Sequence, residues 1–248
     1  QGWEMLFQSF KPDGLLLNVP RGNTVEPALL AAERCGIPTV VLYHTWKDGV
    51  ANGRLVHHFT LIGVWNLRMK ESVLEQNPRL PANHVRVVGC AHFDGLARPG
   101  GGSPERELRS SLGLRPDGRL VLFPASAPWV VPQEERYVEI LWRAIRDGWL
   151  PPDLQIVVRL NPMDHTSRLE EALGSMSPVV TVLRPDWRWE AKRNWCYQRR
   201  ADFVTYSALL RCSSVCVGVP STVSVECAVV DLPVVNIGFD LPGTPCLN

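Results

Sequence analysis

Short apolar runs of strand length alternate along the whole chain with segments of helical period, and this alternation limits the fold more than any other feature. In the first half, apolar runs at 15–19, 39–43 and 59–65 are separated by helical spacing over 24–35, and a further helix ends near Gln76. Strands that alternate with helices favour parallel sheets covered by helices. The sequence therefore predicts an α/β fold built from two Rossmann-like domains.

The same alternation resumes in the second half, after a break. Further strands are predicted at 120–123, 155–159, 179–183, 215–219 and 234–237. The break is the Gly/Pro cluster from Arg98 to Ser103, which is typical of a linker. A phosphate-binding loop is disfavoured there because no strand leads into the cluster and G-x-G-x-x-G is absent. We predict an amino-terminal domain over 1–97, a linker and first helix over 98–118, and a carboxy-terminal domain over 119–248.

Composition excludes several classes of protein. The net charge of +1 gives no reason to expect nucleic acid as a partner, and no apolar run approaches the roughly 20 residues of a membrane span. The seven cysteines form no C-x-x-C pair and lack histidines at metal-binding spacing, so no metal site is predicted. The chain starts at Gln1 with an element that looks half built. We therefore expect the amino-terminal domain to be incomplete.

The segment from 215 to 240 carries the clearest sign of a binding site. A predicted strand is followed by Gly218-Val219-Pro220, and then Ser221 and Thr222 open a helix. Free backbone N–H groups and two hydroxyls at a helix start suit a diphosphate. Glu226 lies one turn further on the face of Thr222, roughly 6 Å along the axis, where it could accept the hydroxyls of a ribose. The alternative is a plain helix cap with a solvated Glu226.

Three segments resemble the GT-B enzymes that use nucleotide-activated sugars. These are 221–240, 63–94 and 36–46, and they resemble most the CDP-glycerol glycerophosphotransferase and UDP-N-acetylglucosamine 2-epimerase-like groups of bacterial surface polysaccharide synthesis. The resemblance implies that Pro220, Ser221 and Thr222 hold the donor diphosphate and that Glu226 holds the ribose. It also implies a carboxy-terminal donor-binding domain and an amino-terminal domain that receives the acceptor.

The resemblance places further donor-binding residues after two other strands. Arg159 and Asn161 stand where relatives often have Arg-x-His-Pro, so a guanidinium could offset diphosphate charge there. Asn161 replaces the histidine, which removes any role that needs a proton at that position. Ser126 lies in the loop 125–129 after another strand, which is either part of the donor site or an ordinary surface loop.

A general base would follow a strand of the first domain. His44 and Asp48 lie there, and either could take a proton from an acceptor hydroxyl within about 3 Å. The alternative is a structural turn with a half-buried His44. The Trp-rich stretch 184–200 has an excess of positive charge. It is expected to be irregular, and it could cover the nucleotide, face an anionic acceptor, or pack as a solvated cap.

The resemblance implies a metal-independent glycosyltransferase, or a glycerophosphotransferase-like enzyme, that acts in surface glycan synthesis. Its partners would be a nucleotide-activated sugar or polyol and a glycan or lipid-linked acceptor, with peripheral membrane contact and no nucleic acid. No cofactor beyond the nucleotide-sugar substrate is implied. The implied location is the bacterial cytoplasm, at the inner face of the membrane. Two alternatives stay open, which are a sugar-nucleotide epimerase of the same fold and a non-catalytic nucleotide-sugar-binding fragment.

Overall fold

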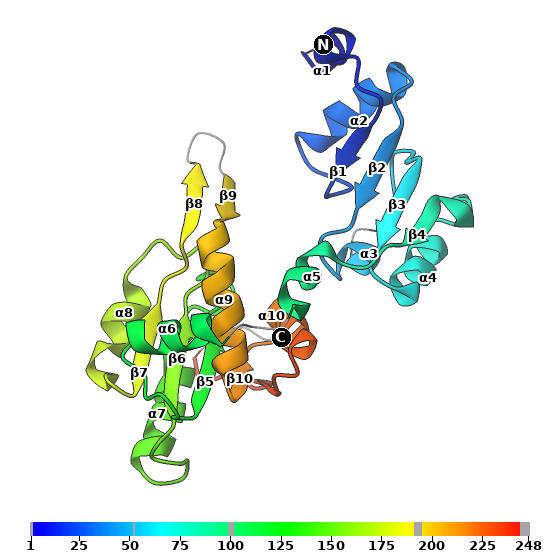
Figure 1. The fold of residues 1–248 in the computed structure, drawn as a ribbon. Coiled ribbons are helices and arrows are strands. Elements are labelled where there is room, and N and C mark those ends of the chain that lie inside the picture. Colours follow the sequence, from blue (N-terminus) through cyan, green and yellow to red (C-terminus); the bar gives the residue numbers. More distant parts are fainter. Residues whose placement is uncertain (1, 52, 99–101, 191–194, 244–248) are drawn as a thin grey trace. The chain divides into compact units, whose positions relative to one another are not determined.

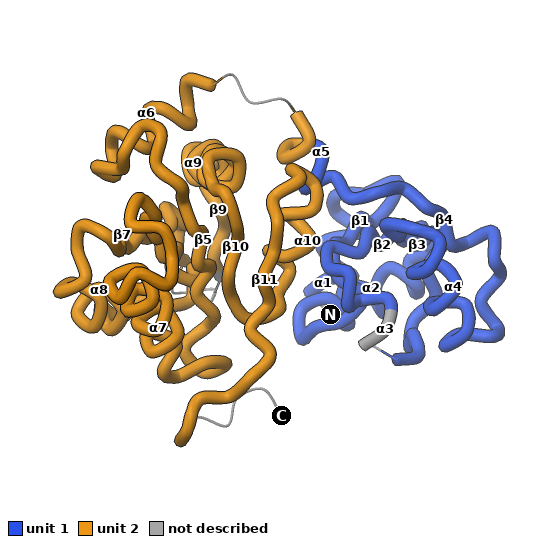
Figure 2. The backbone as a smooth tube through the Cα atoms, turned by 90° about the horizontal axis from the view of Figure 1, so that it is seen from below, with its two compact units in different colours: residues 1–94 blue, residues 95–248 orange. Residues whose placement is uncertain are grey.

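The structure is a computed structural model that describes residues 2–51, 53–98, 102–190 and 195–243. It divides into two compact units, residues 1–94 and 95–248, which Figure 2 draws in different colours. The division falls three residues before the predicted end of the first domain. The predicted linker lies partly outside the described residues, at 99–101. Within the described part, no helix is long and apolar enough to cross a membrane.

Unit 1 is a parallel sheet of four strands in the order β1-β2-β3-β4. The strands are β1 (Leu15–Leu17), β2 (Thr39–Leu42), β3 (Leu61–Val64) and β4 (Val85–Val87), and the helices are α1 (Gly2–Phe10), α2 (Val25–Arg34), α3 (Asp48–Ala51) and α4 (Leu67–Gln76). Apolar side chains of β2, β3 and β4 pack with Leu29 of α2 and Val73 of α4 in one buried cluster. Each strand directly follows its neighbour along the chain, so the sheet of unit 1 has no reversal of strand order.

Unit 2 is a parallel sheet of five strands in the order β11-β10-β5-β6-β7. Figure 1 labels β10, β5, β6 and β7 of this sheet. The strands are β5 (Leu120–Pro124), β6 (Gln155–Arg159), β7 (Val180–Leu183), β10 (Val215–Gly218) and β11 (Val234–Asn236). The helices of this unit are α5 (Ala91–Ala97), which begins in unit 1, α6 (Ser103–Ser111), α7 (Glu135–Arg146), α8 (Arg168–Leu173), α9 (Arg200–Cys212) and α10 (Thr222–Val229). The strands predicted from apolar runs are all present, to within one or two residues.

The two faces of this sheet are covered by different helices. Phe123 and Ile156 lie in a cluster with Tyr137 and Val138 of α7 and Leu169 of α8. Alternate side chains of a strand point to opposite faces, so the neighbouring buried residues of β5 and β6 face the other side of the sheet. On that side α9 contacts β5, and α6 packs on α9. Burial on both faces explains why these strands are continuous apolar runs.

The Trp-rich stretch is not irregular, as the sequence suggested, but contains an antiparallel pair of strands. These are β8 (Trp187–Glu190) and β9 (Trp195–Gln198), which follow β7 and lead into α9 (Figure 1). In β8, tryptophans alternate with charged residues, which is the period of a strand with two different faces. The β8–β9 hairpin thus extends from the edge strand of the unit 2 sheet.

Candidate functional site

The order of strands in unit 2 reverses between β5 and β10. From β5 the chain proceeds through β6 to β7 on one side, and then returns to place β10 on the other side. In open α/β sheets, ligands bind beyond the carboxyl ends of the strands at such a reversal. Gly218 ends β10 here, and a Cβ atom on it would lie 3.2 Å from Cδ of Pro124 at the end of β5. Because glycine stands at 218, the two strand ends approach closely.

The predicted helix start lies at this reversal. Ser221 is the N-cap of α10, and its hydroxyl accepts a hydrogen bond from the backbone N of Val223 at 3.3 Å. Pro220 and Ser221 are exposed, and Thr222 is half-buried. The positive end of the helix dipole and the first N–H groups of α10 therefore lie at the surface, where an anion could reach them.

Glu226 is buried rather than solvated. It lies one turn into α10 and accepts a hydrogen bond from the hydroxyl of Tyr206, a residue of α9. Burial raises the pKa of Tyr206 well above its ordinary value, and the neighbouring Glu226 raises it further. The phenol therefore keeps its proton and acts as the donor in this bond. Glu226 is held in place by a buried partner, whatever else it binds.

Arg159, at the carboxyl end of β6, belongs to a buried ion pair. Its Nη2 atom donates to Oδ2 of Asp202 in α9 at 2.7 Å, and the two side chains are 8% and 2% exposed. Asp202 also accepts hydrogen bonds from Asp186 N, Trp187 Nε1 and Gln198 Nε2. Burial alone would raise the pKa of Asp202, but the charge of Arg159 and these bonds reverse the effect and lower it.

Part of the Arg159 guanidinium has no polar partner in the described residues. The Nη1 atom is buried and makes no hydrogen bond there, while the guanidinium carbon lies 4.8 Å from the ring centre of Tyr206. Asp202 neutralises Arg159, so the guanidinium that was expected to offset diphosphate charge is half of a buried ion pair. Its remaining N–H groups are what a ligand at this edge could use.

Asn161 and Ser126 both shape the loops that follow their strands. The Asn161 side chain accepts a hydrogen bond from the backbone N of Met163 at 3.0 Å, which closes a turn after β6. The backbone N of Ser126 donates to both carboxylate oxygens of Glu134, at 2.9 and 2.7 Å. Glu134 is fully buried, and burial raises its pKa to about 7, an effect that the bonds from Ser126 and the charge of Arg168 only partly offset.

In unit 1 the structure brings His44 and Asp48 together. His44 Nδ1 lies 3.1 Å from Asp48 Oδ2 and 3.0 Å from the backbone O of Asn18. Both neighbours are acceptors, so Nδ1 carries the proton and Nε2 of the neutral ring has a free lone pair. The Asp48 side chain is 7% exposed and also accepts from the backbone N of Thr45, whereas the His44 side chain is 49% exposed. A fixed carboxylate that orients an accessible imidazole is suited to general base chemistry.

Sequence reasoning missed three buried polar residues around the site, Asp202, Tyr206 and Glu134. Asp202 and Tyr206 are four residues apart and so share one face of α9, the face that the sheet covers. That spacing could have indicated a buried ion pair, because a carboxylate on an otherwise apolar helix face needs a buried partner. Within the described ranges, no group of three His, Cys, Asp or Glu side chains could hold a metal ion.

No family model and no curated protein matches this chain. Solved structures do match. MnaA of S. aureus, solved with UDP, is 14% identical with a TM-score of 0.65, and the match covers 94% of this chain and 60% of that one. The UDP-GlcNAc 2-epimerase of Neisseria meningitidis, solved with UDP-GlcNAc, is 15% identical with a TM-score of 0.63, covering 95% and 62%.

A third match is the UDP-GlcNAc 2-epimerase of Methanocaldococcus jannaschii, which is 13% identical with a TM-score of 0.61, covering 97% of this chain and 65% of that one. The chain thus spans less than two thirds of the length of these structures. Its two parallel α/β units match them over almost its whole length. The chain has the GT-B-like fold of the UDP-GlcNAc 2-epimerases.

Proposed function

We propose that unit 2 binds a nucleoside diphosphate sugar at the reversal between β5 and β10. The diphosphate would lie over the start of α10, where Ser221 and Thr222, which follow Pro220, present backbone N–H groups and hydroxyls. Ser126 would line the opposite side, in the loop after β5. Glu226 would hold the ribose through its carboxylate.

The observation that carries this proposal is the meeting of the exposed α10 start with the reversal of strand order. The buried Nη1 atom of Arg159, which lacks a polar partner among the described residues, adds a donor at the same carboxyl edge. Asn161 would then support the turn next to Arg159 rather than touch the ligand. Two of the matching structures were solved with UDP or UDP-GlcNAc, which makes a uridine diphosphate the first ligand to test.

A thermal-shift titration tests the donor site. Among UDP-, CDP- and GDP-linked sugars, one is expected to stabilise the protein by about 2.7 kcal/mol at a hundredfold excess over its dissociation constant, because it binds only the folded state. Replacing Glu226 with glutamine should weaken the binding of that ligand by about ten- to a hundredfold, which corresponds to the loss of a hydrogen bond to a charged group. Each variant is compared with its own melting temperature without ligand.

Tyr206→Phe is the matched control for this titration. It removes the donor of the internal hydrogen bond to Glu226 but leaves the carboxylate in place. The control should therefore bind the nucleotide nearly as well as the wild type. If none of the three nucleotides shifts the melting temperature of the wild type, the donor site is wrong.

We further propose that the reaction is transfer of the activated sugar, or of a polyol phosphate, to a hydroxyl acceptor in surface glycan synthesis. His44 would take the proton of the acceptor hydroxyl through Nε2, and Asp48 would stabilise the imidazolium that results. The charge of the departing nucleotide would be stabilised by the start of α10 and by Arg159 without a metal ion. The sequence segments that resemble the glycerophosphotransferase group support this proposal.

His44→Ala is expected to lower turnover by about 10²- to 10⁴-fold, the usual contribution of general acid–base catalysis. Affinity for the nucleotide should not change, because His44 would act on the acceptor hydroxyl and not on the nucleotide. Release of nucleotide from the donor, measured over a panel of glycan acceptors, reports the effect. His58, an exposed histidine of the same unit, provides the control substitution. Equal loss with His58→Ala would mean that the effect is not specific to His44.

Epimerisation of the sugar nucleotide is the second candidate, favoured by the two matching structures named above that are UDP-GlcNAc 2-epimerases. The two reactions differ in what they need. An epimerase interconverts two UDP-sugars without any acceptor, whereas a transferase releases nucleotide only when a hydroxyl takes the sugar. Proton NMR of the sugar nucleotide, with and without acceptor, separates them. Binding with neither reaction would identify a nucleotide-sugar-binding module.

A further inference from the structure

The β8–β9 hairpin has an inner face that is tied to the body of unit 2. Trp187 lies directly opposite Gln198 across the two strands, and both donate hydrogen bonds to Asp202, at 3.0 and 2.8 Å. On the same face, the ring of Trp189 lies 4.9 Å from that of His165. Cys196 Sγ, opposite Trp189, is 3.7 Å from Met163 Sδ. These contacts fix the inner face of the hairpin.

The outer face of the hairpin carries a different set of side chains. Arg188 and Tyr197 are directly opposite each other there, because they alternate with the inner residues of their strands. Arg199 continues the same alternation beyond β9. The residue Tyr197 is 41% exposed and the Arg199 side chain is 59% exposed. Arg199 also pairs with Asp186 at 3.2 Å, which limits the directions that its guanidinium can take.

These residues surround a hollow of about 470 Å³, which we call the hairpin pocket. It is lined by Asp186, Trp187, Arg188, Trp189, Tyr197 and Arg199. The volume lies within the range of about 300–1,000 Å³ that small-molecule sites occupy. Two guanidinium groups against one carboxylate leave the pocket with a net charge of +1. An aromatic surface beside a surplus of one cation is suited to a ligand with an apolar ring face and one negative charge.

We infer that the hairpin pocket binds a saccharide that carries a single anionic group, a carboxylate or a phosphate. The C–H face of a pyranose ring packs on Tyr197, the anionic group pairs with the guanidinium of Arg188, and Arg199 with Asp186 offers a donor and an acceptor to ring hydroxyls. This inference goes beyond the proposed donor site, and a saccharide bound here is separate from the sugar of the donor.

The place of the hairpin in the sheet supports a second ligand. The hairpin follows β7, the edge strand, whereas the proposed donor site is centred between β5 and β10 and reaches Arg159 at the end of β6. With strands about 4.8 Å apart, β7 and β10 are separated by roughly 14 Å. In the proposed function, the second substrate is a glycan acceptor. A charged glycan is one that the hairpin pocket could hold while a nucleotide occupies the reversal.

Calorimetric titration without nucleotide tests the inference directly. The probes are methyl glucuronide and glucose 1-phosphate, with methyl glucoside as the neutral match. Both anionic sugars should bind at least tenfold more tightly than the neutral one. The substitution Arg188→Gln should lower the affinity for the two anionic sugars by about tenfold. The substitution Tyr197→Ala should lower the affinity for all three sugars. Both substitutions lie on the outer face, so the bonds to Asp202 remain.

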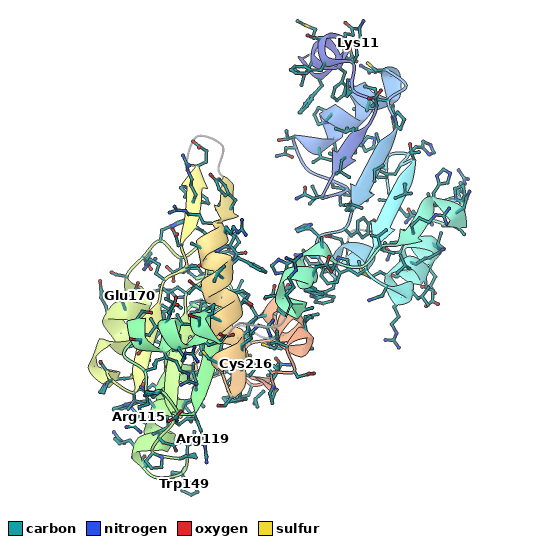
Figure 3. The ribbon with its side chains drawn as sticks, in the orientation of Figure 1. Lys11, Arg115, Arg119, Trp149, Glu170 and Cys216 are labelled. Atoms are coloured by element: carbon teal, nitrogen blue, oxygen red, sulfur yellow. The ribbon has the colours of Figure 1, made fainter. Side chains whose placement is uncertain are left out.

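Arg119→Gln and Trp149→Ala are the matched controls. Figure 3 shows both residues at the end of unit 2 away from the hairpin, and Trp149 is 85% exposed. Neither change should alter sugar binding by more than about twofold. The inference is overturned if the neutral sugar binds as tightly as the anionic ones, or if the controls weaken binding as much as Arg188→Gln. It is also overturned if Arg188→Gln abolishes binding of UDP and not of sugars, since the pocket would then belong to the nucleotide.

Discussion

Replacing Asp202 with alanine is expected to lower the free energy of unfolding of unit 2 by about 3–5 kcal/mol. The reason is that Arg159, only 8% exposed, would be left as a buried charge without its counterion. Three further donors, Asp186 N, Trp187 Nε1 and Gln198 Nε2, would lose their acceptor in the same variant. Hydrogen exchange resolved by peptide is the suitable measurement, because it reports β6 and α9 separately from unit 1.

The double variant Asp202→Ala with Arg159→Met separates the lost charge pair from the lost packing. Removing the guanidinium removes the unpaired charge, so the double variant should be more stable than Asp202→Ala alone. A buried pair can be replaced by apolar groups at little net cost, whereas removal of one partner is costly. If Asp202→Ala costs less than about 1 kcal/mol, or if the second change destabilises further, the ion pair is not what stabilises this edge.

The second large effect concerns pH and Glu134. The folded-state pKa of this buried carboxyl is about 7, above its ordinary value of 4.5, so between these two values the native state binds more protons than the unfolded state. The stabilising contribution of Glu134 is therefore complete below about pH 4.5 and is lost as the pH rises through 7. At about 1.36 kcal/mol per pH unit, the loss amounts to about 3 kcal/mol.

Glu134→Gln should remove this pH dependence. Glutamine resembles the protonated carboxyl, and its oxygen can still accept the hydrogen bond from the backbone N of Ser126. The variant should match the wild type at pH 5 and be more stable at pH 8, as measured by urea unfolding across that range. The pKa values of Asp164 and Asp202 are lowered, so these two carboxyl groups titrate at a more acidic pH than the range in which Glu134 titrates. Parallel stability curves for the two proteins would show that Glu134 does not titrate here.

The fold was largely predictable, because buried parallel strands leave a continuous apolar signature in the sequence. Gln155–Arg159 was predicted to the residue, and Val180–Leu183 to within one. The β8–β9 hairpin was missed although Trp187 to Glu190 alternates with the period of a strand. The density of charged residues and tryptophans suggested a loop. The hairpin packs through tertiary contacts, among them those with Met163 and His165, and such contacts cannot be read from the local sequence.

The site was predictable only where its geometry is local. Ser221 as the cap of α10 followed from the hydroxyl before a helical period, and the pairing of His44 with Asp48 is a contact between residues four apart. The partner of Arg159 was not predictable, because the ion pair joins residues 43 apart in the chain. Which carboxylate meets that guanidinium depends on how α9 packs on the sheet. The roles of these residues toward a ligand stay predictions until binding is measured.

The reversal between β5 and β10 also sets the order in which the chain can fold as it is synthesised. Strand β5 is complete at Pro124, and β6 and β7 can join one of its edges soon afterwards. Its other edge has no neighbour until β10 is made, roughly 90 residues later, which at about 5–20 residues per second takes on the order of 5–20 s. During that interval an apolar strand of five residues presents unpaired backbone groups along one edge. Nascent chains of this protein should therefore depend on chaperones most between the synthesis of β7 and that of β10.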